Sequence, residues 1–133
     1  VERVVDGDTV DVVLDLGFDI LYKSRVRLYG IDTPESRTRN KDEKARGKMA
    51  AAFLEDAINN GKQVVIQTKL KDSRGKFGRV LGDVVVDGIN INQSMIDNYH
   101  AVAYFGQSKE AIEAVHQSNR TRLIELGKFS PVE

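Results

Sequence analysis

The chain has 133 residues, of which 41% are hydrophobic and 30% charged, and this size and balance favour one globular domain over residues 1–133. Cysteine is absent, which excludes disulfides and thiolate metal sites. Lys plus Arg and Asp plus Glu both number 20, so the zero net charge gives no general support for a nucleic-acid partner, although basic residues outnumber acidic ones between positions 23 and 48.

Targeting and membrane signals are missing from the sequence. No apolar stretch approaches the ~20 residues that a membrane span needs, and no signal-peptide pattern is visible. We therefore expect a soluble protein with no membrane partner, and a monomer by default. The compartment stays unknown, because the chain starts at Val1 and its N-terminus can have been trimmed.

The first half of the chain predicts three strands and a helix. Residues 1–5 are short and β-branched, residues 9–14 alternate between apolar and polar, and residues 20–31 resume that alternation after a glycine. A helix over residues 42–60 follows and stops at Asn60-Gly61. The apolar face expected for this helix consists of Ala45, Met49, Ala52, Phe53 and Ala57, widened by Leu54 and Ile58.

The second half predicts two strands and two helices. The strands cover residues 64–66 and 79–86, and Asn90 is expected to cap a short helix to residue 98. Residues 101–105 are a short extended piece, and Ser108 begins a helix that Gly127 closes. The core positions expected in the two helices are Ile91, Met95 and Ile96 in the first, and Ile112, Val115, Leu123 and Leu126 in the second.

The predicted fold is mainly β with α, in the order β-β-β-α-β-β-α-α. Five short strands with a helix between the third and fourth, followed by two more helices, are typical of an OB-fold barrel. We expect these strands to pair in antiparallel fashion.

Two carboxylates stand at the ends of predicted strands. Asp8 follows the first turn, in Asp6-Gly7-Asp8-Thr9, and Asp32 ends the third strand. Two carboxylates with a backbone carbonyl and waters suit one Ca²⁺ ion, whereas Mg²⁺ demands a stricter octahedron and is less favoured. No cluster of His or Cys favours zinc. Taken alone, the motif around Asp8 is more often only a turn.

A carboxylate and two arginines complete the candidate site. Glu35 could take a proton from an attacking water, although it could also simply begin a loop or helix. Arg27 and Arg79 could hold a phosphate through their guanidinium groups. Arg79 closes a Gly- and Lys-rich segment, residues 71–79, whose plainer interpretation is an exposed hairpin turn. We expect His116 to be a surface residue of the last helix, and neither it nor His100 to be catalytic.

These motifs resemble the staphylococcal nuclease (thermonuclease) family. The resemblance rests on Val5-Asp6-Gly7-Asp8-Thr9, on the stretch from Arg27 to Glu35 (RLYGIDTPE), on Lys76-Phe77-Gly78-Arg79, and on the closing Gly127-Lys128-Phe129-Ser130. It covers nearly the whole chain, in the family's order and at similar spacing.

The resemblance implies an OB-fold and Ca²⁺-dependent cleavage of DNA and RNA to 3′-phosphate ends. It implies that Asp8, Asp32 and the backbone carbonyl of Thr33 bind calcium. It further implies that Glu35 orients or deprotonates water, and that two arginines hold the scissile phosphate. The groups implied for phosphate and nucleotide binding are Arg27, Arg79, Lys76 and Tyr104. A second pocket tyrosine is absent, and Phe77 follows Lys76.

The sequence therefore predicts a calcium-dependent nuclease that hydrolyses phosphodiester bonds by in-line attack of water. One alternative is a non-catalytic OB-fold module that binds nucleic acid or serves as a scaffold. Another is a protein-interaction domain without any nucleic-acid role. The retained acidic and arginine residues favour the enzyme. The sequence leaves open the choice between DNA and RNA and between single and double strands.

Overall fold

A computed structural model describes residues 1–68 and 80–131 of the chain. The strands are β1 (Arg3–Asp6), β2 (Thr9–Asp15), β3 (Leu21–Leu28), β4 (Ile31–Asp32), β5 (Val64–Thr68), β6 (Val80–Val86), β7 (Ile89–Asn90) and β8 (Val102–Ala103). The helices are α1 (Lys41–Asn59), α2 (Ile91–Asp97) and α3 (Lys109–Glu125).

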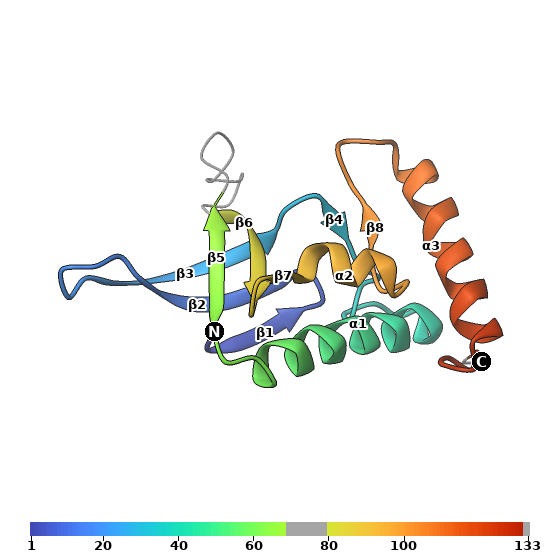
Figure 1. Ribbon diagram of the computed structural model, residues 1–133. Coiled ribbons are helices and arrows are strands. Elements are labelled where there is room, and N and C mark those ends of the chain that lie inside the picture. The colour runs from blue at the N-terminus through green and yellow to red at the C-terminus, as the bar shows by residue number, and fades with distance from the viewer. Residues whose placement is uncertain (69–79, 132–133) are drawn as a thin grey trace.

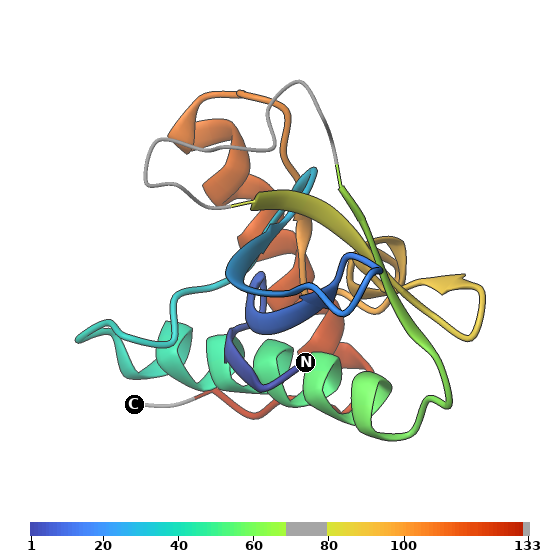
Figure 2. The ribbon, with the colours of Figure 1, turned by 90° about the vertical axis from the view of Figure 1, so that its left-hand side faces the viewer.

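Most strands form one mixed sheet, in the order β1-β2-β3-β6-β5. The short strand β7 pairs with β6, while β4 and β8 form a separate two-stranded ladder. Helix α1 lies along one side of the strands, and α3 stands at the end of the molecule farthest from the β2–β3 turn (Figure 1). A view turned by 90° again shows α1 beside the strands (Figure 2). The order of strands and helices roughly matches the OB-fold prediction, with β4, β7 and β8 as additional short strands, and that fold class is confirmed.

The strand predictions need two corrections. The segment at residues 20–31 is not one strand, because the chain turns at Tyr29-Gly30 and divides it into β3 and β4; Gly30 takes a positive φ of 76° there. The pair β3–β6 is parallel, not antiparallel. A parallel pair needs a long crossover connection, and here β4, α1 and β5 supply it.

Side-chain caps begin all three helices. Asn40, Asn90 and Ser108 each accept a hydrogen bond from the backbone N–H three residues later, at 3.0, 3.1 and 3.2 Å. These bonds satisfy N–H groups that have no partner within the helix. The caps predicted at Asn90 and Ser108 are therefore confirmed.

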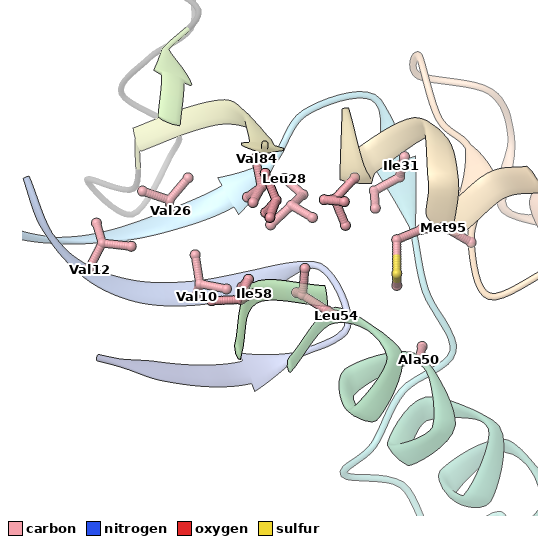
Figure 3. Close-up of a cluster of buried hydrophobic side chains, with 13 residues drawn as sticks. Val10, Val12, Val26, Leu28, Ile31, Ala50, Leu54, Ile58, Val84 and Met95 are labelled. Carbon is pink, nitrogen blue, oxygen red and sulfur yellow. The ribbon is translucent and has the colours of Figure 1, made fainter. Parts of the chain in front are cut away.

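The core lies between the sheet, α1 and α2 (Figure 3). Alternation along β2 and β3 turns Val10, Val12, Val26 and Leu28 inward, where each is at most 2% exposed. The buried positions predicted in α2, Ile91 and Met95, are confirmed.

The faces predicted for α1 and α3 were partly wrong. In α1 the buried apolar stripe is Ala50, Leu54 and Ile58, whereas Ala52 is exposed. In α3 the buried residues are His116 and Leu123, while Val115 and Leu126 are 45% and 46% exposed. Both helices carry apolar residues on more than one side, so periodicity alone did not identify the side that packs against the rest of the protein.

Candidate active site

Asp8 is placed by the turn between β1 and β2. A side chain at the preceding Gly7 would lie 2.7 Å from the Cβ of Ala50, so only glycine allows this turn to pack so closely against α1. The Asp8 carbonyl accepts a hydrogen bond from the Leu28 N–H at 2.8 Å. The Thr9 hydroxyl donates to Asp8 Oδ1 at 3.0 Å. Backbone and side chain together fix this carboxylate beside the end of β3.

Asp32 and Thr33 reach the same place from β4. Asp32 lies opposite Val102 in the β4–β8 ladder, immediately after the turn that ends β3. The Thr33 N–H points at Asp8 Oδ2, at 3.4 Å, and Thr33 itself is 4% exposed. Residues 25 positions apart in sequence are therefore neighbours in space.

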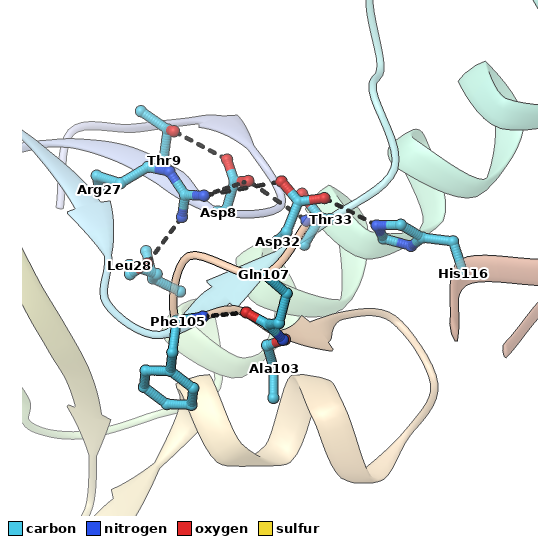
Figure 4. Close-up of polar contacts among 10 residues, drawn as sticks. All are labelled: Asp8, Thr9, Arg27, Leu28, Asp32, Thr33, Ala103, Phe105, Gln107 and His116. Carbon is cyan, nitrogen blue, oxygen red and sulfur yellow. Dashed lines mark hydrogen bonds and ion pairs between the residues drawn. The ribbon is translucent and has the colours of Figure 1, made fainter. Parts of the chain in front are cut away.

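Arg27 lies within ion-pair distance of both carboxylates (Figure 4). Its Nη2 is 3.5 Å from Asp8 Oδ2 and 3.8 Å from Asp32 Oδ1. Its Nη1 donates a much shorter hydrogen bond, of 2.8 Å, to the Leu28 carbonyl. The side chain is 17% exposed. The backbone therefore anchors one end of the guanidinium, and the other end meets the carboxylates at ion-pair rather than hydrogen-bond distance.

Glu35 lies in the negative field of the other acidic groups. Partial burial of its carboxyl raises its pKa above the ordinary value, and the charges of Asp8, Asp6, Asp32 and Glu43 raise it further. The Ser36 hydroxyl donates to Asp6, and this contact holds the segment after Pro34 against the β1–β2 turn. Like charges around a carboxyl favour its protonated form, so Glu35 accepts a proton more readily than an isolated glutamate does.

Two pockets open beside these residues. One, of about 480 Å³, is lined by acidic groups that include Asp32, Glu35 and Glu43, together with Thr33 and His116. The other, of about 450 Å³, is lined by Arg27, the β3–β4 turn and the aromatic residues Tyr29, Tyr104 and Phe105. Tyr104 borders both pockets and is 39% exposed. The Tyr29 and Phe105 rings meet edge to face, with centroids 6.2 Å apart.

The donor set suits a hard cation. The carboxylates of Asp8 and Asp32 both lie within 4 Å of one positive group, the guanidinium of Arg27. Thr33 follows Asp32 directly, so its carbonyl is a further oxygen close by. In the described part of the chain, no three Asp, Glu, His or Cys side chains cluster closely enough to hold a metal by themselves. Two carboxylates, a carbonyl and waters therefore fit Ca²⁺, which accepts irregular oxygen coordination, better than zinc.

The structure thus brings together five of the predicted site residues, namely Asp8, Arg27, Asp32, Thr33 and Glu35. Tyr104, which directly follows β8, lines the same pocket as Asp32, Thr33 and Glu35. Lys76 and Arg79 lie outside the described residues.

Comparison with known proteins agrees with this arrangement. The family model described as staphylococcal nuclease homologue matches residues 25–122, which is most of the chain. The chain belongs to the staphylococcal nuclease family. This family assignment confirms the resemblance seen in the sequence motifs.

Relatives of this staphylococcal nuclease family member carry nuclease names. The SPbeta prophage-derived endonuclease YokF of Bacillus subtilis is 33% identical over 77% of this chain and 33% of its own length. The thermonuclease of Staphylococcus intermedius is 38% identical over 63% of this chain and 46% of its own. Endonuclease YhcR of B. subtilis is 29% identical over 79% of this chain but only 9% of its own length. The chain thus spans less than half of each of these relatives.

The sequence analysis of this nuclease-family chain did not identify two buried polar residues. His116 was predicted at the surface but is 6% exposed, and its Nε2 lies 2.8 Å from Asp32 Oδ2. Asn92, 4% exposed, donates to the Tyr29 carbonyl at 2.9 Å and accepts from the Val84 N–H at 3.0 Å, so it ties the end of β3 to β6. Both contacts join distant segments, and no local motif signals them.

Among the described residues, none of the helices combines the length and apolar character needed to cross a membrane.

Proposed function

We propose that this chain is a calcium-dependent nuclease that hydrolyses phosphodiester bonds of DNA, RNA or both. The observation that carries the proposal is the approach of Asp8 and Asp32 to one guanidinium nitrogen of Arg27, beside a carboxylate of raised pKa. The endonuclease names of the relatives support the same reaction class.

Arg27 is proposed to hold the scissile phosphate. Its Nη2 is only loosely engaged by two carboxylates, while its Nη1 is anchored on the backbone, so a phosphate oxygen can take the place of the carboxylate contacts. Negative charge grows on phosphorus as it becomes pentacoordinate, and a preorganised guanidinium stabilises that charge more than the ground state. By its sequence motif, Arg79 is proposed as a second clamp and Lys76 as a ligand of a nucleotide phosphate.

Glu35 is proposed as the proton acceptor. In-line attack forms a bond from the water oxygen to phosphorus and breaks the bond from phosphorus to the 5′ oxygen. The water proton passes to Glu35, and the leaving 5′ oxygen takes a proton from solvent, to which Glu35 later returns its own; the products are a 3′-phosphate end and a 5′-hydroxyl. A carboxylate whose pKa is raised by burial and by neighbouring acids is a stronger base than an ordinary glutamate.

Asp8, Asp32 and the Thr33 carbonyl are proposed to hold one calcium ion. When bound, the ion supplies positive charge beside the phosphate and offsets the repulsion between substrate and carboxylates. The aromatic pocket next to Arg27 is proposed to receive a nucleotide base, with Tyr104 and its neighbour Phe105 offering faces for stacking.

The test is digestion of single- and double-stranded DNA and of RNA, with Ca²⁺ and with a chelator. We expect cleavage only with Ca²⁺. The cleavage rate of Glu35→Gln should be lower than that of the wild type by several orders of magnitude, with the fold retained. Arg25→Lys is the control, because the exposed Arg25 of β3 pairs with Asp11 of β2 and its replacement should not affect turnover.

The outcomes separate the rival functions. Cleavage that survives chelation would reject the metal role, and full activity of Glu35→Gln would remove Glu35 from the mechanism. Salt-dependent binding without any cleavage would support instead a non-catalytic OB-fold module that binds nucleic acid.

A further inference from the structure

His116 connects the last helix to a proposed calcium ligand. It lies on α3, 84 residues after Asp32, and its side chain is 8% exposed. Its Nε2 lies 2.8 Å from Asp32 Oδ2 (Figure 4). An ionised carboxylate can only accept hydrogen bonds, so the imidazole must donate from Nε2.

This contact divides the two oxygens of Asp32 between different partners. His116 binds Oδ2, while Oδ1 faces Arg27 at 3.8 Å and the side where Asp8 lies. The Asp32 side chain is 34% exposed, so solvent alone would leave its carboxylate free to rotate. The hydrogen bond from a buried imidazole removes that freedom.

We propose that His116 is a positioning residue that orients Asp32 so that only Oδ1 is presented to the cation. The inference rests on the proposed function, because it assumes that Asp32 binds calcium. Groups that hydrogen-bond to a metal ligand fix its orientation, and their loss typically weakens metal binding by about 10–100-fold.

Helix α3 does not need His116 to stay in place. Asn119 donates to the Ala101 carbonyl at 3.1 Å, Arg120 donates to Asp42 at 3.0 Å, and Leu123 is 2% exposed. These three contacts come from the following two turns of the helix and hold it against the body of the protein. Removal of the imidazole should therefore leave a folded chain whose Asp32 is less well oriented.

The experiment measures Ca²⁺ affinity by calorimetry for the wild type, His116→Ala, His116→Gln and Leu123→Ala, together with metal-free melting of each. We expect His116→Ala to bind Ca²⁺ roughly 10–100-fold more weakly. His116→Gln should recover much of the affinity, because its terminal amide can still donate to Asp32. Leu123→Ala is the matched control: it removes a buried side chain of the same helix, so it should melt at lower temperature but keep the wild-type affinity.

Three results would overturn the inference in distinguishable ways. If the wild type binds Ca²⁺ and His116→Ala, still folded by its melting curve, binds it as tightly as the wild type, the positioning role is wrong while the metal site stands. If Leu123→Ala weakened Ca²⁺ binding as much as His116→Ala does, the effect of His116 would come from the packing of α3 and not from the orientation of Asp32. A wild type that binds no Ca²⁺ would overturn the calcium site itself, and the role of His116 with it.

Discussion

At the scale of single residues, Arg27 has two roles that oppose each other. It offsets part of the negative charge of Asp8 and Asp32, at 3.5 and 3.8 Å, and it is the residue proposed to bind the scissile phosphate. A cation between the carboxylates would compete with the guanidinium for the same oxygens. Binding of metal should therefore release Arg27 toward substrate.

Substitution of Arg27 should separate these roles. Both Arg27→Ala and Arg27→Lys should lower kcat by about 10²–10³, since a lysine cannot reproduce the two-pronged contact with a phosphate. Ca²⁺ affinity should be kept or increased, because a competitor for the carboxylates is lost or weakened. Steady-state kinetics at saturating Ca²⁺ and calorimetry measure the two effects. A parallel loss of metal affinity and rate would mean that Arg27 only supports the fold of the site.

Glu35 gives a prediction about pH. Its pKa is raised in the folded protein by burial and by Asp8, Asp6, Asp32 and Glu43, so the folded state binds the proton more tightly than the unfolded state does. Its contribution to stability is therefore full below the unfolded pKa and is lost as the pH rises through the folded pKa. In chelator, Glu35→Gln should be more stable than the wild type at neutral pH.

The difference between the two proteins should shrink on acidification and vanish once Glu35 is protonated in both states. Urea unfolding of both proteins from pH 3.5 to 7 tests this, and other titrating acids cancel in the comparison. A Glu35→Gln variant that is less stable than the wild type at neutral pH would contradict the raised pKa of Glu35 in the folded protein.

How far the sequence predicts the site depends on the distance between its parts along the chain. Asp8, Arg27, Asp32 and Glu35 lie within one short stretch that folds on itself through adjacent strands, so their motifs were enough to group them. His116 approaches the group from the other end of the chain, on a helix whose buried side was predicted only in part. Its contact depends on tertiary packing, for which the sequence carries no local pattern.

At the scale of elements, the ends of helices were more predictable than their faces. A cap is a contact within four residues, and Asn90 and Ser108 behave as their types suggest. The buried side of α1 instead depends on where the sheet lies, and it includes Arg46 and Gly47, which no hydrophobic pattern would select. The parallel β3–β6 pair is a similar case, because it joins segments separated by a whole helix.

Gly47 shows how α1 supports the site. A side chain at this position would lie 2.6 Å from the Glu35 carbonyl oxygen and 2.7 Å from that of Pro34, both rigid backbone atoms. Glycine in a helix normally costs stability relative to alanine. Here Gly47→Ala should instead destabilise the protein, by about 1–3 kcal/mol, because it overpacks the contact.

The same substitution should lower kcat, since it displaces the backbone that carries the proton acceptor, and small misplacements are costly in rate. Lys48→Ala is the control: this neighbour is exposed on the same helix and should change stability by no more than about 0.5 kcal/mol. Denaturant melts and single-turnover rates measure both effects. A stabilised Gly47→Ala variant would show that α1 does not press on the Glu35 segment.

At the scale of the whole molecule, charge is balanced but not uniform. Equal numbers of acidic and basic residues give no net attraction to a polyanion. The acidic pocket at Asp32, Glu35 and Glu43 would repel phosphate, while Arg27 lines the aromatic pocket next to it. Productive binding should therefore depend on a cation at the acidic side, which couples metal binding to substrate binding.

The same coupling should appear in global stability. A cation that binds only the folded state stabilises it according to its free concentration, by about 2.7 kcal/mol at 100 times its Kd. We expect Ca²⁺ to raise the wild-type free energy of unfolding by this increment, and Asp8→Asn and Asp32→Asn to lose most of it.

Asp11→Asn is the matched control. It removes a carboxylate of β2 that pairs with Arg25 and Arg3, so it should lower stability without Ca²⁺ yet keep the increment. Urea unfolding of the four proteins, with Ca²⁺ and with chelator, decides the matter. An increment that persists in Asp8→Asn and Asp32→Asn would place the stabilising cation somewhere other than between these two side chains.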